Sequence, residues 1–291
     1  MIDETTKAAS PPTISARGKL RIVVVIAALV VVLIVLLPFH LMALGGAKVW
    51  ALFRGKSVGG LVTGAMPFLF HKAVLRCMGV RLKLHGQISN ARPLLLVANH
   101  VSWLDIVVLG AVAPLSFVAK SEMRSWPVFG QLAMLQRTVF VARDDRRRAG
   151  IQATEIAARM TAREIMVLFP EGTTSDGMGL LPFKTPLFEA AKLALAESPV
   201  TEAVVQPVAL RYSHLSGLPM GRAQMPHVAW PGEIGLGESL LPIIAKGAID
   251  VAVHLGHPIA MDECANRKVV AAQAGAAIRQ MLLPRHEQPL R

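Results

Sequence analysis

The segment LLLVANHVSWLD, residues 94–105, decides the fold and holds the first candidate catalytic pair. Its apolar run Leu94–Ala98 has the length of a buried strand, and the polar residues after it indicate a turn. His100 and Asp105 are five residues apart, whereas neighbours on one face of a helix are three or four apart. We therefore expect His100 just before a helix and Asp105 in its first turn, where the carboxylate would orient the imidazole. The alternative is an ordinary helix start capped by Ser102 or Asp105.

The composition points to a membrane surface rather than to nucleic acid. The 291 residues are 53% hydrophobic, have a mean hydropathy of +0.48 and carry a formal net charge of +12. Aromatic residues make up only 5%, so the stacking rings that accompany basic patches in nucleic-acid binders are scarce. We expect an anionic membrane or an acidic substrate carrier as partner, and no nucleic acid. Cys77 and Cys264 provide neither a disulfide framework nor metal-ligand spacing.

The N-terminal region is expected to attach the chain to a membrane. Residues 1–21 are polar and predict a disordered tail, and residues 22–46 are apolar for long enough to form a transmembrane helix. A signal peptide is the alternative, but its apolar region is typically ~7–15 residues long. Residues 47–80 predict an amphipathic helix region on the membrane surface. The alternative for that region is a helix that covers the core of the following domain.

In this amphipathic region we expect a polar face at helical spacing, made by His71, Lys72 and Arg76. Basic residues lie on both sides of residues 22–46, so the charge pattern does not decide how the chain is oriented in the membrane.

Residues 81–284 alternate short apolar runs with helical patterns, which predicts an α/β domain with a largely parallel sheet flanked by helices. A polar tail, residues 285–291, follows this domain. A Gly- and Pro-rich stretch, Ser213–Ser239, predicts a long loop. The expected strands are Leu94–Ala98, Ser116–Ala119, Thr138–Ala142, Ile165–Phe169, Val204–Leu210 and Ile249–Leu255. The expected helices are Val128–Leu135, Ile151–Glu164, Leu187–Leu195 and Val269–Leu283.

Chemistry in such sheets collects beyond the carboxyl ends of the parallel strands. Polar residues stand at several of these ends, and their convergence favours a functional site over an ordinary helix start. They are His100 with Asp105, Lys120, Arg143, and Glu171 with Gly172 and Thr173.

Four segments resemble, in order, the sequence blocks of the glycerolipid acyltransferases, a membrane-bound family that includes 1-acylglycerol-3-phosphate acyltransferase. The resemblance covers roughly residues 80 to 215. The segments are NHVSWLD (Asn99–Asp105), FVAK with VFVAR (Phe117–Lys120 and Val139–Arg143), FPEGTTS (Phe169–Ser175) and VQPVAL (Val205–Leu210).

The resemblance implies acyl transfer from a thioester, on acyl carrier protein or coenzyme A, to a lyso-lipid hydroxyl, without a cofactor or metal. An alcohol must lose its proton as it attacks, and an imidazole suits that role because its unperturbed pKa is about 6.5. His100 would be the general base and Asp105 would hold its ring. By the same resemblance, Arg143 and the turn Glu171–Gly172–Thr173 would bind the acceptor headgroup. His254 and His257 are expected to be structural.

Two positions depart from the family pattern. Members that form phosphatidic acid usually read FPEGTRS, and Thr174 stands where that arginine would be; Arg137 replaces a glycine of the second block. With AWPGE (Ala229–Glu233), the third block looks more like the lyso-ornithine lipid acyltransferase branch, in which the headgroup is not a phosphate. The alternatives are a phosphatidic-acid-forming enzyme and a non-catalytic lipid-binding protein on the same fold. We expect the protein in the inner membrane as a single-pass protein, with its acyltransferase domain on the cytoplasmic face.

Overall fold

The computed structural model describes residues 14–54, 60–142, 146–196, 202–231, 235–262 and 264–283. The strands are Val80–His85 (β1), Leu94–Ala98 (β2), Leu115–Lys120 (β3), Val139–Val141 (β4), Ile165–Leu168 (β5), Ala203–Leu215 (β6), Leu218–Pro219 (β7), Ile249–Leu255 (β8) and Ile259–Met261 (β9). The α-helices are Ala16–Arg54 (α1), Gly60–Met78 (α2), Leu104–Gly110 (α3), Phe129–Leu135 (α4), Arg146–Thr161 (α5), Glu189–Ala196 (α6), Leu236–Lys246 (α7) and Arg267–Leu282 (α8). Three short 3-10 helices are Ser121–Ser125 (η1), Pro186–Phe188 (η2) and Met225–His227 (η3).

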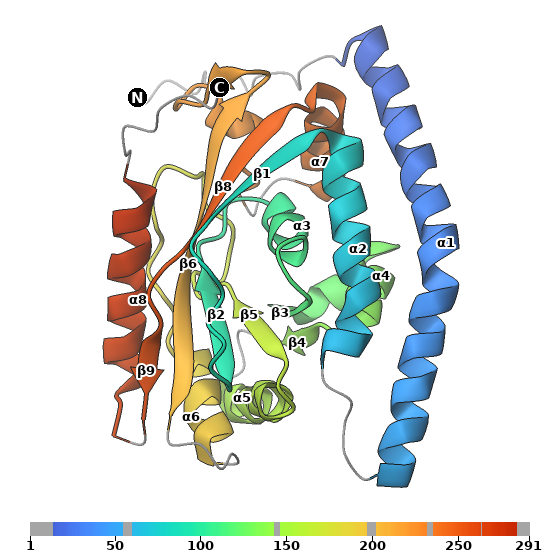
Figure 1. The fold of residues 1–291 in the computed structure, drawn as a ribbon. Helices are drawn as coiled ribbons and strands as arrows, with labels where there is room; N and C mark the ends of the chain where they lie inside the picture. The colour runs from blue at the N-terminus through green and yellow to red at the C-terminus, as the bar shows by residue number, and fades with distance from the viewer. Residues whose placement is uncertain are drawn as a thin grey trace, which may run out of the picture.

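One mixed sheet organises the chain, with the strand order β1-β8-β6-β2-β5-β3-β4, and with β7 and β9 paired to β6 (Figure 1). The strands from β6 to β4 are parallel to one another, while β8 is antiparallel to β6 and parallel to β1. The expectation of a largely parallel sheet flanked by helices is therefore confirmed.

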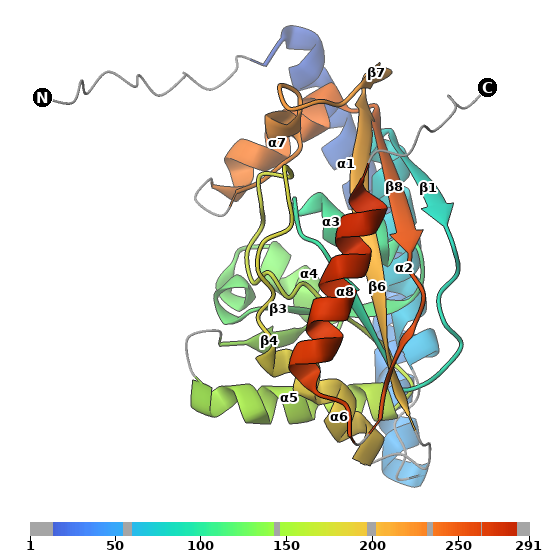
Figure 2. The ribbon, with the colours of Figure 1, turned by 90° about the vertical axis from the view of Figure 1, so that its left-hand side faces the viewer.

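Helices cover both faces of this sheet, and β2 shows why (Figures 1 and 2). All five residues of β2 are buried, and their side chains enter two different cores in alternation. Leu94, Leu96 and Ala98 join the core that includes residues of α2, α3 and α7. Leu95 and Val97 join the core that includes residues of α5, α6 and α8. A strand buried on both faces reads as one apolar run, as this segment does.

The N-terminal helices pack against the α/β domain and against each other. α1 begins at Ala16, inside the segment expected to be a disordered tail, and α1 and α2 run antiparallel (Figure 1). His71, expected on a polar helix face, is only 6% exposed, so that expectation was wrong. Val74 and Met78, three and seven positions after His71, lie on the same buried face of α2 and belong to the core, whereas Lys72 and Arg76 are exposed. In this respect α2 behaves as a helix that covers the core of the next domain.

The stretch expected as one long loop, Ser213–Ser239, contains regular structure at both ends. β6 continues to Leu215 because β8 pairs with its C-terminal part, from Val208 to Leu215. At the other end, α7 begins at Leu236. The glycine and proline content misled the loop prediction for two reasons. The pairing of β6 with β8 joins residues that are far apart in the chain, and α7 is a helix although it contains Pro242.

Candidate active site

The turn after β2 is fixed to the neighbouring strand by Asn99. Its side chain donates to the carbonyl of Leu210 at 3.1 Å and accepts from the Leu210 N–H at 2.8 Å. This pair continues the ladder between β2 and β6 by one step beyond Ala98, the last paired residue of β2. Asn99 therefore holds the next residue, His100, at a defined point above the carboxyl edge of the sheet.

Asp105 lies in the first turn of α3, fully buried, and binds His100. Its Oδ2 atom is 2.9 Å from His100 Nδ1 and also accepts the backbone N–H groups of Val101, at 2.6 Å, and Ser102, at 2.8 Å. One carboxylate thus both orders the turn before α3 and holds the ring, whereas the N-cap residue of α3, Trp103, makes no side-chain capping hydrogen bond. An ionised carboxylate only accepts hydrogen bonds, so Nδ1 of His100 carries the proton and Nε2 is left as the acceptor.

Tyr212, which no sequence motif indicated, binds the second oxygen of the Asp105 carboxylate. The hydroxyl of Tyr212, on β6, donates to Asp105 Oδ1 at 2.6 Å. Its partner lies 107 positions away in the chain, so no local pattern could have indicated it. The His100 ring also stacks on Phe169, with ring centroids 4.0 Å apart.

The loop after β5 holds the backbone of His100 from both sides. Glu171 Oε1 accepts the His100 N–H at 2.7 Å, and Oε2 accepts the Leu181 N–H at 2.8 Å. Ser175 donates its N–H to the His100 carbonyl at 2.8 Å. Burial raises the pKa of Glu171 to about 7, although its two backbone donors lower it. The sequence blocks around His100 and Glu171 are therefore one structural unit.

The remaining residues expected in the site have diverse positions. Gly172 has φ of +76°, a left-handed conformation that glycine adopts without strain, and Thr173 is exposed. Lys120 is half-exposed at the end of β3 and pairs with Glu122 at 3.4 Å. Arg143 lies outside the described residues.

The two departures from the family pattern also have structural explanations. Thr174 is 8% exposed and donates its hydroxyl to the Trp230 carbonyl. Arg137 has φ of +60°, the conformation in which a glycine costs least. The Arg137 guanidinium pairs with buried Glu164 at 2.9 Å and donates to the hydroxyl of Thr63 on α2 at 2.7 Å. Arg137 thereby ties α2 to the α/β domain.

His100 opens onto an apolar cavity of about 480 Å³. The cavity lies among α1, α2, α3, α4 and α7, on the same side of the sheet as α3, and Trp103, Phe169 and Trp230 line it near His100. His71 also lines it, and desolvation lowers the pKa of His71 to about 4, so this ring is neutral. An apolar cavity beside an imidazole is suited to a lipid chain.

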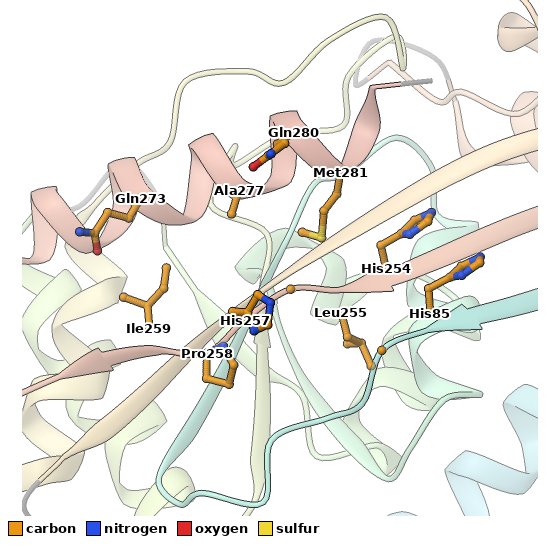
Figure 3. A pocket seen from close by; sticks show the side chains of 12 residues that line it. His85, His254, Leu255, His257, Pro258, Ile259, Gln273, Ala277, Gln280 and Met281 are labelled. Atoms are coloured by element: carbon orange, nitrogen blue, oxygen red, sulfur yellow. The ribbon is translucent and has the colours of Figure 1, made fainter. Parts of the chain in front are cut away.

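A second cavity, of about 630 Å³, lies beside α8 and is lined by three histidines, His85, His254 and His257 (Figure 3). His85 ends β1 and His254 is the last but one residue of β8, and their rings stack with centroids 4.4 Å apart. His257 lies beside Pro258 (Figure 3). Within the described residues no group of three His, Cys, Asp or Glu could hold a metal ion, these histidines included.

The α/β fold and this site define an acyltransferase domain. A family model described as Acyltransferase matches residues 81–211. The chain is also 45% identical over 265 residues to the Lyso-ornithine lipid O-acyltransferase of Brucella abortus (strain 2308), which covers 91% of this chain and 95% of the relative. The chain therefore belongs to the acyltransferase family.

Other known proteins agree with this assignment. Identity is 49% over 220 residues to the Lyso-ornithine lipid O-acyltransferase of Rhizobium meliloti (strain 1021), covering 76% of this chain and 75% of the relative. It is 37% over 213 residues to the 1-acyl-sn-glycerol-3-phosphate acyltransferase of Neisseria meningitidis, covering 70% and 78%. The crystal structure of the 1-acyl-sn-glycerophosphate acyltransferase from Thermotoga maritima shares the fold, with a TM-score of 0.53 at 21% identity over 86% of this chain and 95% of that chain.

Proposed function

We propose that the protein transfers an acyl group from an acyl thioester to the hydroxyl of a lyso-lipid, with His100 as general base and Asp105 as the group that orients it. The observation that carries the proposal is an imidazole whose Nδ1 is held by a buried carboxylate while the ring faces an apolar cavity. This geometry leaves Nε2 to accept the proton of an alcohol.

The reaction follows from these positions. The lyso-lipid oxygen attacks the thioester carbonyl carbon while Nε2 of His100 removes the hydroxyl proton. The tetrahedral intermediate bears a negative oxygen, and its collapse breaks the carbon–sulfur bond. The departing thiolate takes the proton from the imidazolium, which leaves an ester, a thiol and a neutral His100. Asp105 stays ionised throughout and stabilises the imidazolium.

Lyso-ornithine lipid is the acceptor that we propose, and two observations support it. Relatives at 49% and 45% identity are named Lyso-ornithine lipid O-acyltransferase. In addition, the side chain of Thr174 carries no positive charge for a phosphate, and its hydroxyl is bound to the Trp230 carbonyl. A second candidate is 1-acyl-sn-glycerol-3-phosphate, which the named activity of the Neisseria relative favours.

For the headgroup we keep Arg143, Gly172 and Thr173 as proposed contacts. Glu171 has a different proposed role, because both of its oxygens are engaged by backbone N–H groups. We infer that Glu171 positions His100 and does not contact the headgroup. As donor, acyl carrier protein or acyl-coenzyme A suits a chain with a net charge of +12, since both are acidic.

Membrane attachment is proposed to occur through α1, which is long and apolar enough to cross a bilayer. However, Gly18, Val25 and His40 on α1 are all buried. The stretch from Gly18 to His40 is about 33 Å long in a helix, and a bilayer hydrocarbon core is about 30 Å thick. A perpendicular span would therefore place the α/β domain inside the bilayer. We propose instead that α1 lies along the cytoplasmic face of the membrane, with its exposed apolar side in lipid. This arrangement replaces the expected single-pass span over residues 22–46.

Labelling of introduced cysteines tests this arrangement. Cys77 and Cys264 are first replaced by serine, and Ser15→Cys or Lys48→Cys is then added near either end of α1. An impermeant maleimide applied to inside-out vesicles should label both variants if α1 lies along one leaflet. Labelling of only one variant would support a span.

The function itself is tested with purified protein. Acyl-acyl carrier protein or acyl-coenzyme A is the donor, and each acceptor is supplied in turn. We expect an ester product with lyso-ornithine lipid at a kcat/KM at least tenfold above that with lysophosphatidate. A preference for lysophosphatidate would favour the second candidate. Lack of transfer to either acceptor with either donor would contradict the proposal and leave the lipid-binding alternative.

A further inference from the structure

We propose that Tyr212 is a positioning residue for the reaction, whose hydroxyl fixes the orientation and charge distribution of Asp105 and through it the basicity of His100. The inference rests on the proposed acyl transfer, and it assigns a role to a residue outside the four sequence blocks that carry the family resemblance.

The hydrogen bonds of Asp105 are divided unequally between its two oxygens. Oδ2 accepts from three groups: His100 Nδ1, the Val101 N–H and the Ser102 N–H. For Oδ1 the donor is the Tyr212 hydroxyl at 2.6 Å. Because a carboxylate can rotate about its Cβ–Cγ bond, a donor on the opposite oxygen fixes the plane in which Oδ2 meets the imidazole. Tyr212 thus completes the support of the ring.

The position of Tyr212 suits a permanent donor. Tyr212 is only 3% exposed. It lies on β6 two residues beyond Leu210, whose backbone is bound by the Asn99 side chain. Burial, followed by the negative charge of Asp105, raises the pKa of the Tyr212 phenol well above its usual value. The phenol therefore stays protonated and donates over the whole range in which an enzyme of this kind works.

The hydrogen bond also lowers the negative charge that the Asp105 carboxylate presents to His100. A donor on Oδ1 withdraws negative charge from the carboxylate, so less charge faces His100. Removing the donor should leave Oδ2 more negative and stabilise the imidazolium. The acidic limb of the pH–rate profile should then move to higher pH, because His100 would be protonated, and inactive as a base, over a wider range.

Tyr212→Phe provides the first test, because it keeps the buried ring and removes the hydroxyl. We expect kcat to fall by about tenfold, which is typical when a group that orients a reactive one is lost. KM should stay within twofold, and the acidic limb should shift upward. The matched control is Ser116→Ala, which removes a buried hydroxyl bound to Glu164 near the other end of the sheet. The control should lose some thermal stability and leave the acidic limb in place.

Fluorinated tyrosine provides a second test that does not depend on an altered fold. The sequence contains one tyrosine, so biosynthetic incorporation of 3,5-difluorotyrosine changes Tyr212 alone. A more acidic phenol is a stronger donor, so the acidic limb should move to lower pH, opposite to its movement in Tyr212→Phe. Equal profiles for the natural, Phe and fluorinated proteins would overturn the proposal, because a merely structural hydroxyl would not tune the base.

A spectroscopic measurement separates this inference from the proposed function. Tyrosine labelled with ¹³C at Cζ gives one signal, from Tyr212. In Asp105→Asn that signal should shift, and the phenol should ionise at a lower pH than in the natural chain, because the neighbouring charge is gone. An unchanged signal and titration would overturn the contact itself. If the contact is present but the natural protein transfers no acyl group, the proposed function fails and the positioning of Asp105 by Tyr212 stands.

Discussion

His100 follows the carboxyl end of β2, and His85 and His254 lie near the carboxyl ends of β1 and β8; among the described residues these two sites differ in what holds the histidine rings. His100 follows β2 and is held at Nδ1 by Asp105, at its N–H by Glu171 and at its carbonyl by Ser175. His85 and His254 lie near the carboxyl ends of β1 and β8 and stack on each other beside the cavity near α8 (Figure 3). Nε2 of His85 has no hydrogen-bond partner among the described residues.

A histidine at the end of a strand therefore does not by itself indicate a catalytic base. An imidazole becomes a directed base when a carboxylate fixes its tautomer and when the backbone that carries it cannot move. Both conditions are met at β2, next to the apolar cavity. The rings of His85 and His254 stack on each other beside the second cavity.

The largest effect on the reaction is expected when the carboxylate of Asp105 is removed. In Asp105→Asn the amide no longer fixes the ring tautomer, and kcat should fall by about 10³-fold or more, as in other base–carboxylate pairs. The assay is acyl transfer under saturating acceptor, with binding of lyso-lipid measured separately. Asp250→Asn is the control, because Asp250 pairs with Arg81 on the exposed side of β1. A loss of less than tenfold in Asp105→Asn would contradict the role of Asp105 in holding the His100 ring.

The backbone support can be weakened without touching the ring. Glu171→Gln keeps the size of the side chain but turns an N–H₂ group toward one of the two backbone donors. Loss of one bond should loosen His100 and lower kcat by about 10-fold, with little change in KM. Glu189→Gln, which affects only the half-exposed pair with Arg267, should leave kcat unchanged. A rise in KM alone would indicate that Glu171 contacts the headgroup.

The raised pKa of Glu171 also predicts how stability depends on pH. A carboxyl group whose pKa is about 7 in the folded protein and about 4.5 when unfolded binds more protons in the folded state between these values. The free energy of unfolding should therefore fall as pH rises through about 7. Melting temperatures from pH 5 to 8 in detergent should show this decline for the natural chain and a weaker decline for Glu171→Gln. Parallel curves would mean that Glu171 does not titrate in this range.

The smallest effect is expected at the stacked histidines. His85→Gln and His254→Gln, singly or together, should change acyl transfer by less than about twofold, because these rings do not border the cavity beside His100. Melting temperatures provide the control for folding. A loss of tenfold in kcat at unchanged melting temperature would show that the second cavity takes part in the reaction.

Sequence alone could indicate the elements that depend on local pattern. The strand Leu94–Ala98 was predicted with its observed bounds, and the five-residue spacing led to the observed contact between His100 and Asp105. The partners contributed by distant segments could not be predicted. Tyr212 and the backbone at Leu210 reach this turn only through the pairing of β6 with β2, and α7 was concealed by a Gly- and Pro-rich segment.

In the proposed reaction His100 removes the proton of the acceptor hydroxyl. The most direct test of this role is the turnover of purified His100→Ala with lyso-ornithine lipid and an acyl-acyl carrier protein, at a pH where the natural protein is fully active. We predict a loss of about 10³-fold or more in kcat, with retained melting temperature and retained binding of the lyso-lipid. Turnover within tenfold of the natural protein would contradict the account.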